Sequence, residues 1–374
     1  MKAAYWTVAF LAMIVTCHRI AWGAEKVSSQ RAALREIAAD IEHILARIKG
    51  GNGAPPAVAI GAFSGSVDIA GSAGPGIQTI LEEELRNTKV PVNINAYHYE
   101  ISGRYDAIRH PGNPKLQVIK LTVSLTEKDT GEPLAEQPTR FVLPADVDVP
   151  AMQGAIISGP PLSTPNAISD AIDHAKTTPQ FEVVGSELRG KKGRYAIEVI
   201  VKEKGAYVSR PITVEKDGPL KGRPIVDLRN AEIYGVRLIN KSDIEAAVDL
   251  RIDGINCFAF SKSKATHWIV APHSQLDILG WHRDAKAVIE FKVESKFPDT
   301  AAGKLKLIPS DAIGMITAAF SAAWTLESPP PEDESLVSRG TGFGEEIAFQ
   351  SMNVQRNIGK VRDLLSLRYE KKRD

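Results

Sequence analysis

The chain has 374 residues, of which 43% are hydrophobic and 24% are charged. This length exceeds the size at which one hydrophobic core usually stops growing, so it favours two domains, while the composition excludes wholesale disorder and an integral membrane protein. The 46 basic and 45 acidic residues nearly balance, so no overall charge would attract nucleic acid or an anionic membrane.

Residues 1–24 differ in composition from the rest of the chain. Lys2 precedes an apolar run from Ala3 to Cys17, and Ala21 to Ala24 places small residues where a signal peptidase cleaves. The run is shorter than the roughly 18 apolar residues needed to span a bilayer. We therefore expect a cleaved signal peptide and a periplasmic or secreted protein without a membrane span. The alternatives are a retained anchor and a lipoprotein modified at Cys17, which the preceding threonine disfavours.

Cleavage of this segment would leave a single cysteine, Cys257, so the mature fold would contain no internal disulfide. The stretch from Ile255 to Phe260 is apolar, and a thiol in such a strand is usually a small core residue. The alternative, a nucleophile served by a nearby histidine, needs a polarised and accessible setting. We therefore expect Cys257 to be buried in a strand and chemically inert.

An amphipathic helix is predicted within residues 27–50, because apolar residues recur from Leu34 to Ile48 at spacings of three and four. Ser28 or Ser29 would cap its start, and the glycines at 50 and 51 would end it. The same spacing permits a coiled coil, but only over about two heptads. We expect the helix to pack on its own domain.

A strand, a loop and a second helix follow. The apolar run Ala57 to Phe63 predicts a buried strand, and the pattern from Pro75 to Asn87 predicts the helix. This order also occurs in phosphate-binding loops. However, Gly71, Gly74 and Gly76 match no dinucleotide or nucleotide-binding motif, and Glu82 to Glu84 add negative charge nearby. The sequence therefore predicts a connecting loop.

Alternating apolar residues predict three further strands before residue 150, and a turn predicts a fourth that returns after it. They lie at Val90 to Ala96, Tyr99 to Tyr105, Leu121 to Leu125 and around Phe141 and Val142. Turn residues from Asp129 to Glu132 separate the last two.

Residues 55–150 resemble the small α/β domain at the amino terminus of TolB. The resemblance rests on the strand VAIGAF, the helix IQTILEEEL, the segment YEISGRYD and the hairpin LTVSLTEKDTGEPLAE, with the signatures Gly103-Arg104-Tyr105 and Thr130-Gly131-Glu132. Similar domains occur in the curli-secretion channel lipoprotein, a flagellar outer-membrane lipoprotein and lipoprotein activators of penicillin-binding proteins. The resemblance implies binding and assembly in the envelope and brings no catalytic residues.

Residues 158–180 are predicted to be a linker, because Ser158 to Pro179 is rich in proline, serine and threonine. The linker would separate an α/β domain at 53–157 from a second domain at 181–374. We expect the two to fold independently, with limited proteolysis cutting first in the linker or between Pro329 and Ser338.

The second domain is predicted to be an antiparallel β-sandwich, immunoglobulin-like in architecture, so that the whole chain is α+β. Asp253-Gly254 is the strongest hairpin signal. Two strands, Tyr195–Val201 and Pro211–Val214, are expected on either side of a turn at Lys204-Gly205. Further strands are expected at Val236–Asn240, Leu250–Ile252, Ile255–Phe258, Trp268–Val270, Leu276–Trp281, Val288–Val293, Ile313–Trp324 and Leu364–Tyr369. The segments YGVRLIN, IDGINCFAF, ILGWH and GTGFG resemble a bacterial extracytoplasmic module, which implies an architecture and no function.

Three histidines, His267, His273 and His282, fall in one stretch with Asp277 and Asp284, and residues of these types are the ligands of zinc sites. On the predicted strands, His267 and His282 lie apart and His273 occupies a turn, so no ligand set is expected.

No serine elbow, metalloprotease helix or S-x-x-K element is present, and Asp146 and Asp148 lie among valines and prolines without an evident pocket. Gly340 to Gly344 and Pro329 to Glu334 are predicted to be surface turns, and Lys371 to Arg373 a solvated tail.

From the residues and the resemblance together, we expect a non-enzymatic envelope protein that binds a protein or a cell-wall partner. The expectation includes no catalytic residues, cofactor or metal, and no nucleic-acid partner. The alternative is an extracytoplasmic hydrolase whose site is assembled from residues far apart in the sequence.

Overall fold

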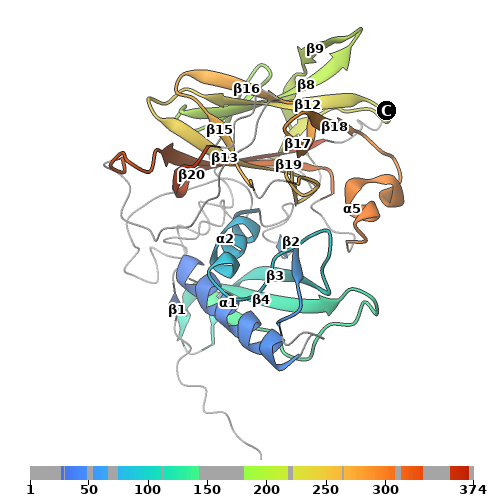
Figure 1. Ribbon diagram of the computed structural model, residues 1–374. Coiled ribbons are helices and arrows are strands. Elements are labelled where there is room, and N and C mark those ends of the chain that lie inside the picture. Colours follow the sequence, from blue (N-terminus) through green and yellow to red (C-terminus); the bar gives the residue numbers. More distant parts are fainter. Residues whose placement is uncertain are drawn as a thin grey trace, which may run out of the picture.

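The computed structural model shows an α+β chain whose described residues are mostly strand, with few helices and with three sheets (Figure 1). It describes residues 27–28, 30–48, 54–65, 75–111, 113–142, 181–217, 222–262, 265–307, 313–331 and 354–369. The signal segment, the linker, Asp146, Asp148, Gly71, Gly74, GTGFG and the tail at 371–373 lie outside these residues. None of the described helices is long and apolar enough to cross a membrane.

Residues 27–142 form an α/β unit with one five-stranded sheet, in the order β1-β5-β4-β3-β2. Its elements are β1 (Val27–Ser28), α1 (Gln30–Arg47), β2 (Val58–Gly65), α2 (Pro75–Arg86), β3 (Tyr99–His110), β4 (Asn113–Glu127) and β5 (Thr139–Val142). Strands β2 and β3 are parallel and are connected through α2, and β3, β4 and β5 are antiparallel. The predicted strand and second helix are thus present, with Pro75 in the first turn of α2.

The amphipathic helix predicted from Leu34 to Ile48 is α1, and it packs on the α/β unit. Its buried face, including Leu34, Ile37, Ile41 and Leu45, joins α2 and the inner side of the sheet in one hydrophobic cluster. Each of these four side chains is fully buried. A fragment that starts at residue 53 would therefore lack one wall of this core.

This packing predicts different behaviour for two fragments. We expect residues 27–157 to fold cooperatively and residues 53–157 to be largely unfolded, because the second fragment exposes the apolar surface that α1 covers. Thermal melting followed by circular dichroism would compare them. A cooperative transition in the shorter fragment would show that α1 is dispensable.

Residues 181–369 form a β-rich unit with two sheets. One has seven strands in the order β10-β11-β20-β19-β13-β14, with β15 beside β13, and the other has eight in the order β17-β18-β12-β8-β7-β6, with β16 beside β12 and β9 beside β8. The seven-stranded sheet contains β10 (Ile212–Val214), β11 (Pro224–Val226), β13 (Glu245–Ile252), β14 (Ile255–Asn256), β15 (Trp268–Val270), β19 (Met315–Trp324) and β20 (Asn357–Tyr369). The eight-stranded sheet contains β6 (Phe181–Val184), β7 (Glu187–Gly190), β8 (Tyr195–Glu203), β9 (Ala206–Ser209), β12 (Ile233–Asn240), β16 (Ser274–Ile278), β17 (Gly280–Asp284) and β18 (Ala287–Lys292).

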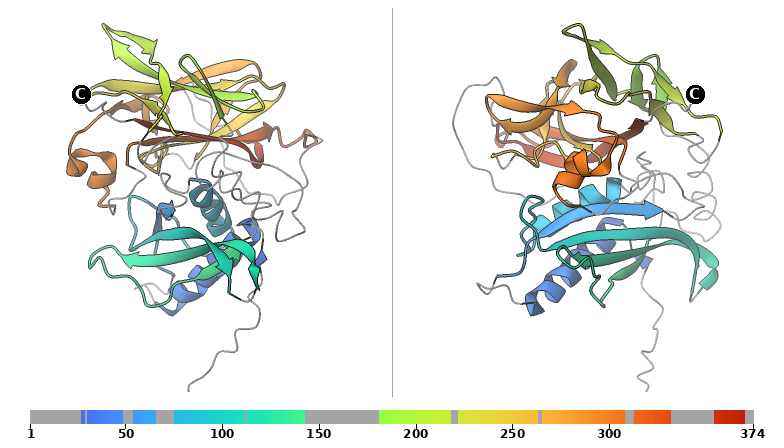
Figure 2. Two further views of the ribbon diagram at one scale, coloured as in Figure 1. Left: turned by 180° about the vertical axis from the view of Figure 1, so that it is seen from behind. Right: turned by 90° about the vertical axis from the view of Figure 1, so that its right-hand side faces the viewer.

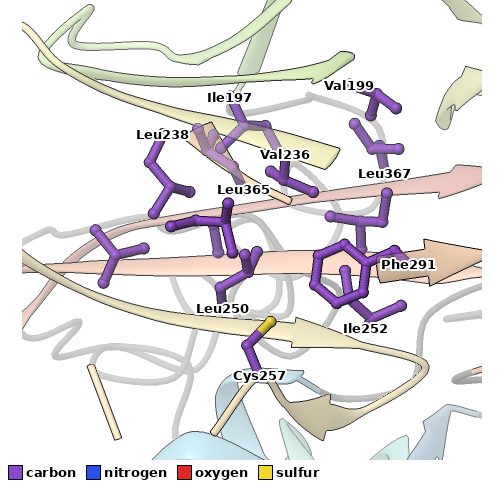
Figure 3. Packing of buried hydrophobic residues seen from close by; sticks show 14 of the residues in the cluster. Ile197, Val199, Val236, Leu238, Leu250, Ile252, Cys257, Phe291, Leu365 and Leu367 are labelled. Carbon is purple, nitrogen blue, oxygen red and sulfur yellow. The ribbon is translucent and has the colours of Figure 1, made fainter. Parts of the chain in front are cut away.

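Side chains from both sheets meet in one hydrophobic cluster. Figure 3 shows Ile197 and Val236 of the eight-stranded sheet facing Leu250 and Leu365 of the seven-stranded sheet. The short helices η3 (Phe297–Asp299) and α5 (Ala301–Lys304) lie beside the sheets. In all three views the α/β unit lies below this arrangement, with α2 and β2 nearest to it (Figure 2).

The hairpin predicted at Asp253-Gly254 is present between β13 and β14. Asp253 has φ 55° and Gly254 has φ 79°, as a two-residue turn with two left-handed positions requires. The turn at Lys204-Gly205 has the same geometry, with φ 48° and 89°. However, the strand that follows this turn and pairs with β8 is β9, which was not predicted from the sequence. The predicted partner, Pro211–Val214, instead contributes β10 to the other sheet.

One predicted strand is wrong. Val90 to Ala96 forms no strand, only a single bridge from Val92 to Val58. Pro91 has no amide hydrogen to donate to a neighbouring strand. The side chain of Asn93 then accepts hydrogen bonds from the amides of Asn95 and Ala96, which turns the chain.

Leu276 to Trp281 is not one strand but two, since the chain leaves β12 after Ile278 and pairs with β18 from Gly280. A side chain at Gly280 would lie 2.2 Å from the carbonyl oxygen of Ile289, so only glycine fits at this crossing.

Candidate functional site

A buried polar cluster joins the two units where α2 meets β13. The guanidinium of Arg251 on β13 bonds the carboxylate of Glu82 on α2 and, with its Nε at 3.1 Å and Nη2 at 2.8 Å, Oδ2 of Asp249. Arg251 is 3% exposed and Asp249 4%. The amide of Asn256 on β14 donates to the other oxygen of Asp249 at 2.7 Å. Glu82 of the α/β unit and the buried Arg251 of the β-rich unit are thus paired with each other.

The charges in this cluster stabilise one another. Burial acts to raise the pKa of Glu82, but Arg251 and Arg86 outweigh it and hold the pKa at about 2. Burial alone would lower the pKa of Arg251, and Asp249 and Glu82 raise it instead. Glu82 and Arg251 are therefore ionised over the physiological range, because their ionic partners offset the cost of removing them from water.

The other glutamates of α2 face α1. Glu84 accepts from Arg31 at 3.1 Å and from Arg35 at 3.0 Å, and Glu83 accepts from Arg31 at 2.8 Å. Burial raises the pKa of Glu83 despite this arginine. In the sequence, these three consecutive glutamates were interpreted only as negative charge near a loop. In the structure, Glu83 and Glu84 bond α2 to α1, and Glu82 bonds α2 to β13.

Further contacts between the units lie around the segment that precedes β3. The hydroxyl of Tyr97 donates to the carbonyl oxygens of Lys306 at 3.0 Å and Leu305 at 3.3 Å. The side-chain amide of Asn95 donates to the carbonyl oxygen of Ala259. Burial raises the pKa of Tyr97 to about 12, so this hydroxyl remains a donor. Tyr97 also packs within the hydrophobic cluster of the β-rich unit.

The three histidines are not brought together. Nδ1 of His267 lies 2.8 Å from the hydroxyl of Thr266, and Nε2 of His273 lies 2.9 Å from the exposed Asp243. His282 bonds Ser261. Within the described ranges, no three histidine, cysteine, aspartate or glutamate side chains are grouped as metal ligands would be. Burial lowers the pKa of His267 and of His282, so both are neutral near pH 7.

Cys257 is fully buried, as predicted, in the cluster between the sheets (Figure 3). It follows directly after β14 rather than lying within a long strand, and its amide donates to the carbonyl oxygen of Leu250. Burial raises its pKa well above the ordinary value, which keeps the thiol protonated.

We expect native Cys257 to react with a thiol reagent only at the rate of unfolding. Labelling with and without denaturant, followed by mass spectrometry, would measure this. Rapid modification of the native protein would contradict the buried position.

Sequence reasoning missed one pair of interest, Ser261 and His282. The hydroxyl of Ser261 lies 2.7 Å from Nδ1 of His282, a distance that suits a nucleophile and its base. The imidazole is 6% exposed and packs against Phe258 and Trp268, with ring centroids 4.9 Å and 5.8 Å away. The two residues are 21 positions apart on different elements, and no spacing motif connects them.

No family model, curated protein or solved structure matches the chain.

Proposed function

We propose that the chain is a non-enzymatic, exported envelope protein that serves as a binding or assembly module for a protein or cell-wall partner. In this proposal, residues 1–24 are a signal peptide and the protein acts in the periplasm or outside the cell. The α/β unit would be of the TolB amino-terminal type, and the β-rich unit an immunoglobulin-like sandwich.

The observation that carries the proposal is the junction itself. Arg251 forms an ion pair with Glu82 across the units and a buried one with Asp249 of its own strand, and Tyr97 inserts from one unit into the core of the other. These contacts fix the orientation of the two surfaces, which favours simultaneous binding of a partner to both. The side chains at the junction are engaged in binding one another, so they suit a structural role better than a chemical one.

Site-specific photocrosslinking in intact cells would test this proposal. A photoreactive residue would replace Val208 on β9, Ile289 on β18 or Leu326 after β19, which are among the most exposed large apolar residues described. The fully buried Val199 provides the matched control position. We expect one exposed position to yield a discrete adduct with an envelope protein or glycan. The proposal would be contradicted if no exposed position gave an adduct, or if the buried position Val199 gave the same adduct in the same amount.

A second candidate function, an extracytoplasmic hydrolase, is favoured only by the Ser261–His282 pair. His282 is neutral near pH 7 and could accept the serine proton as the hydroxyl attacks an acyl carbon. A fluorophosphonate probe would test this. Labelling that Ser261→Ala abolishes and Ser274→Ala leaves intact would support the hydrolase, whereas no labelling would favour the binding module.

A further inference from the structure

Asp363 occupies a core-facing position on β20. It alternates with Leu365 and Leu367, both of which belong to the cluster between the sheets. The pairing of β20 with β19 shifts here, because Phe320 opposes Asp363 while the next residue, Ser321, opposes Val361. The side chain is 8% exposed. A carboxyl group therefore stands where the strand pattern places an apolar side chain.

Gly190 on β7 faces this carboxyl from the opposite sheet. It alternates with the fully buried Leu188, so its missing side chain would also point into the cluster. A Cβ atom at Gly190 would lie 1.7 Å from Oδ2 of Asp363. The carboxyl group is thus packed directly on the backbone of β7, and it joins the two sheets.

The charged groups around this contact come from β7, from the turn between β7 and β8 and from β20. Lys192 and Arg194 of the turn act on Asp363 electrostatically. Arg189 and Glu187 of β7 pair with each other at 2.8 Å, and Arg362 precedes Asp363 on β20. On β19, the neighbours Phe320 and Ser321 carry no charge.

We infer that Asp363 and Gly190 form a pH-responsive joint between the two sheets, which is closed when the carboxyl group is protonated and loosens when it ionises. Burial raises the pKa of Asp363 to about 7, against the lowering effects of the Leu364 amide, Lys192 and Arg194. Because the pKa in the folded chain lies above the ordinary 3.8, the unfolded chain releases the proton first. The stability contributed by the protonated form is complete below about pH 4 and is lost as the pH rises through about 7.

Denaturant unfolding of the full chain at pH 5 and pH 8 would test the joint. From pH 5 to pH 8, the unfolding equilibrium constant of the unaltered chain should rise more than that of Asp363→Asn. We expect the two increases to differ by a factor on the order of 10 to 100. The matched control is Asp129→Asn, since Asp129 is exposed in a turn, and it should follow the unaltered chain. Parallel pH profiles for the unaltered chain and Asp363→Asn would overturn the inference.

A second pair of variants tests the contact independently of titration. Gly190→Ala should destabilise the chain at both pH values, and the double variant Gly190→Ala/Asp363→Ala should recover part of the loss. Hydrogen exchange at the amides of β7 should be faster at pH 8 in the unaltered chain than in Asp363→Asn, after correction for intrinsic rates. An undiminished stability of Gly190→Ala would show that the carboxyl group does not pack there.

Discussion

Replacing Arg251 with alanine should lower the free energy of unfolding by about 3–5 kcal/mol, because it leaves the buried carboxylate of Asp249 and the largely buried carboxylate of Glu82 without their shared partner. Arg251 is 3% exposed, and it bonds both Asp249 and Glu82. Urea denaturation of the full chain would measure the loss. The control is Arg47→Ala, which removes an exposed ion pair to Glu136 and should cost at most about 1 kcal/mol. Equal effects of the two substitutions would contradict a buried junction.

The same junction should make the chain sensitive to acid. The pKa of Glu82 is lowered from 4.5 to about 2, so its ion pair contributes stability above pH 4.5 that is lost as the pH falls towards 2. The shift corresponds to a contribution on the order of 3 kcal/mol. Glu82→Gln should therefore remove most of the change in stability across this window.

Replacing Phe320 with alanine should cost about 3–5 kcal/mol by opening a cavity between the two sheets. Phe320 on β19 is fully buried and stacks on Tyr195 of β8, with ring centroids 4.8 Å apart and planes 16° apart. Denaturant unfolding of the full chain would give the loss. A loss below about 1 kcal/mol would mean that the sheets do not pack at this ring.

Tyr195→Phe provides the control for the stacked pair. The buried hydroxyl of Tyr195 has no hydrogen-bond partner within the described part of the chain. Its removal should be neutral or slightly stabilising, since it relieves an unsatisfied polar group and keeps the ring. A marked loss in Tyr195→Phe would show that this hydroxyl is bonded.

The periodicity of the sequence predicted most individual elements but not how they pair. The three-and-four spacing of Leu34 to Ile48 identified α1, and alternation identified β3 and β4, because burial of one face imposes these periods on the residues themselves. The apolar run from Ile313 to Trp324 identified β19, which is buried on both faces. It failed at Val90 to Ala96, where a proline and an asparagine side chain outweigh an alternating pattern. It also missed β9, since nothing in Ala206–Ser209 distinguishes that strand from a longer turn.

The candidate site was less accessible to prediction, because its partners are far apart in sequence. Glu82 and Arg251 are separated by 169 positions, and Glu82 is chemically identical to neighbours that pair with α1. Asp363 alternates with Leu365 and Leu367 and so faces the core, but a carboxyl group at such a position breaks the apolar pattern by which core strands are recognised. Cys257, in contrast, was correctly predicted as buried, because its apolar neighbours determine its environment.

The place of β20 in the seven-stranded sheet affects when the β-rich unit can fold. This strand, Asn357–Tyr369, lies between β11 and β19 rather than at an edge. The hydroxyl of Tyr369 also donates at 2.6 Å to Asp253, which forms the β13–β14 turn. Until residue 369 has left the ribosome, β11 and β19 have no common neighbour and the cluster lacks Leu365 and Leu367. The unit must therefore complete its fold after synthesis of this segment. A chain that ended before β20 would leave β11 and β19 without the strand that lies between them and the cluster between the sheets incomplete.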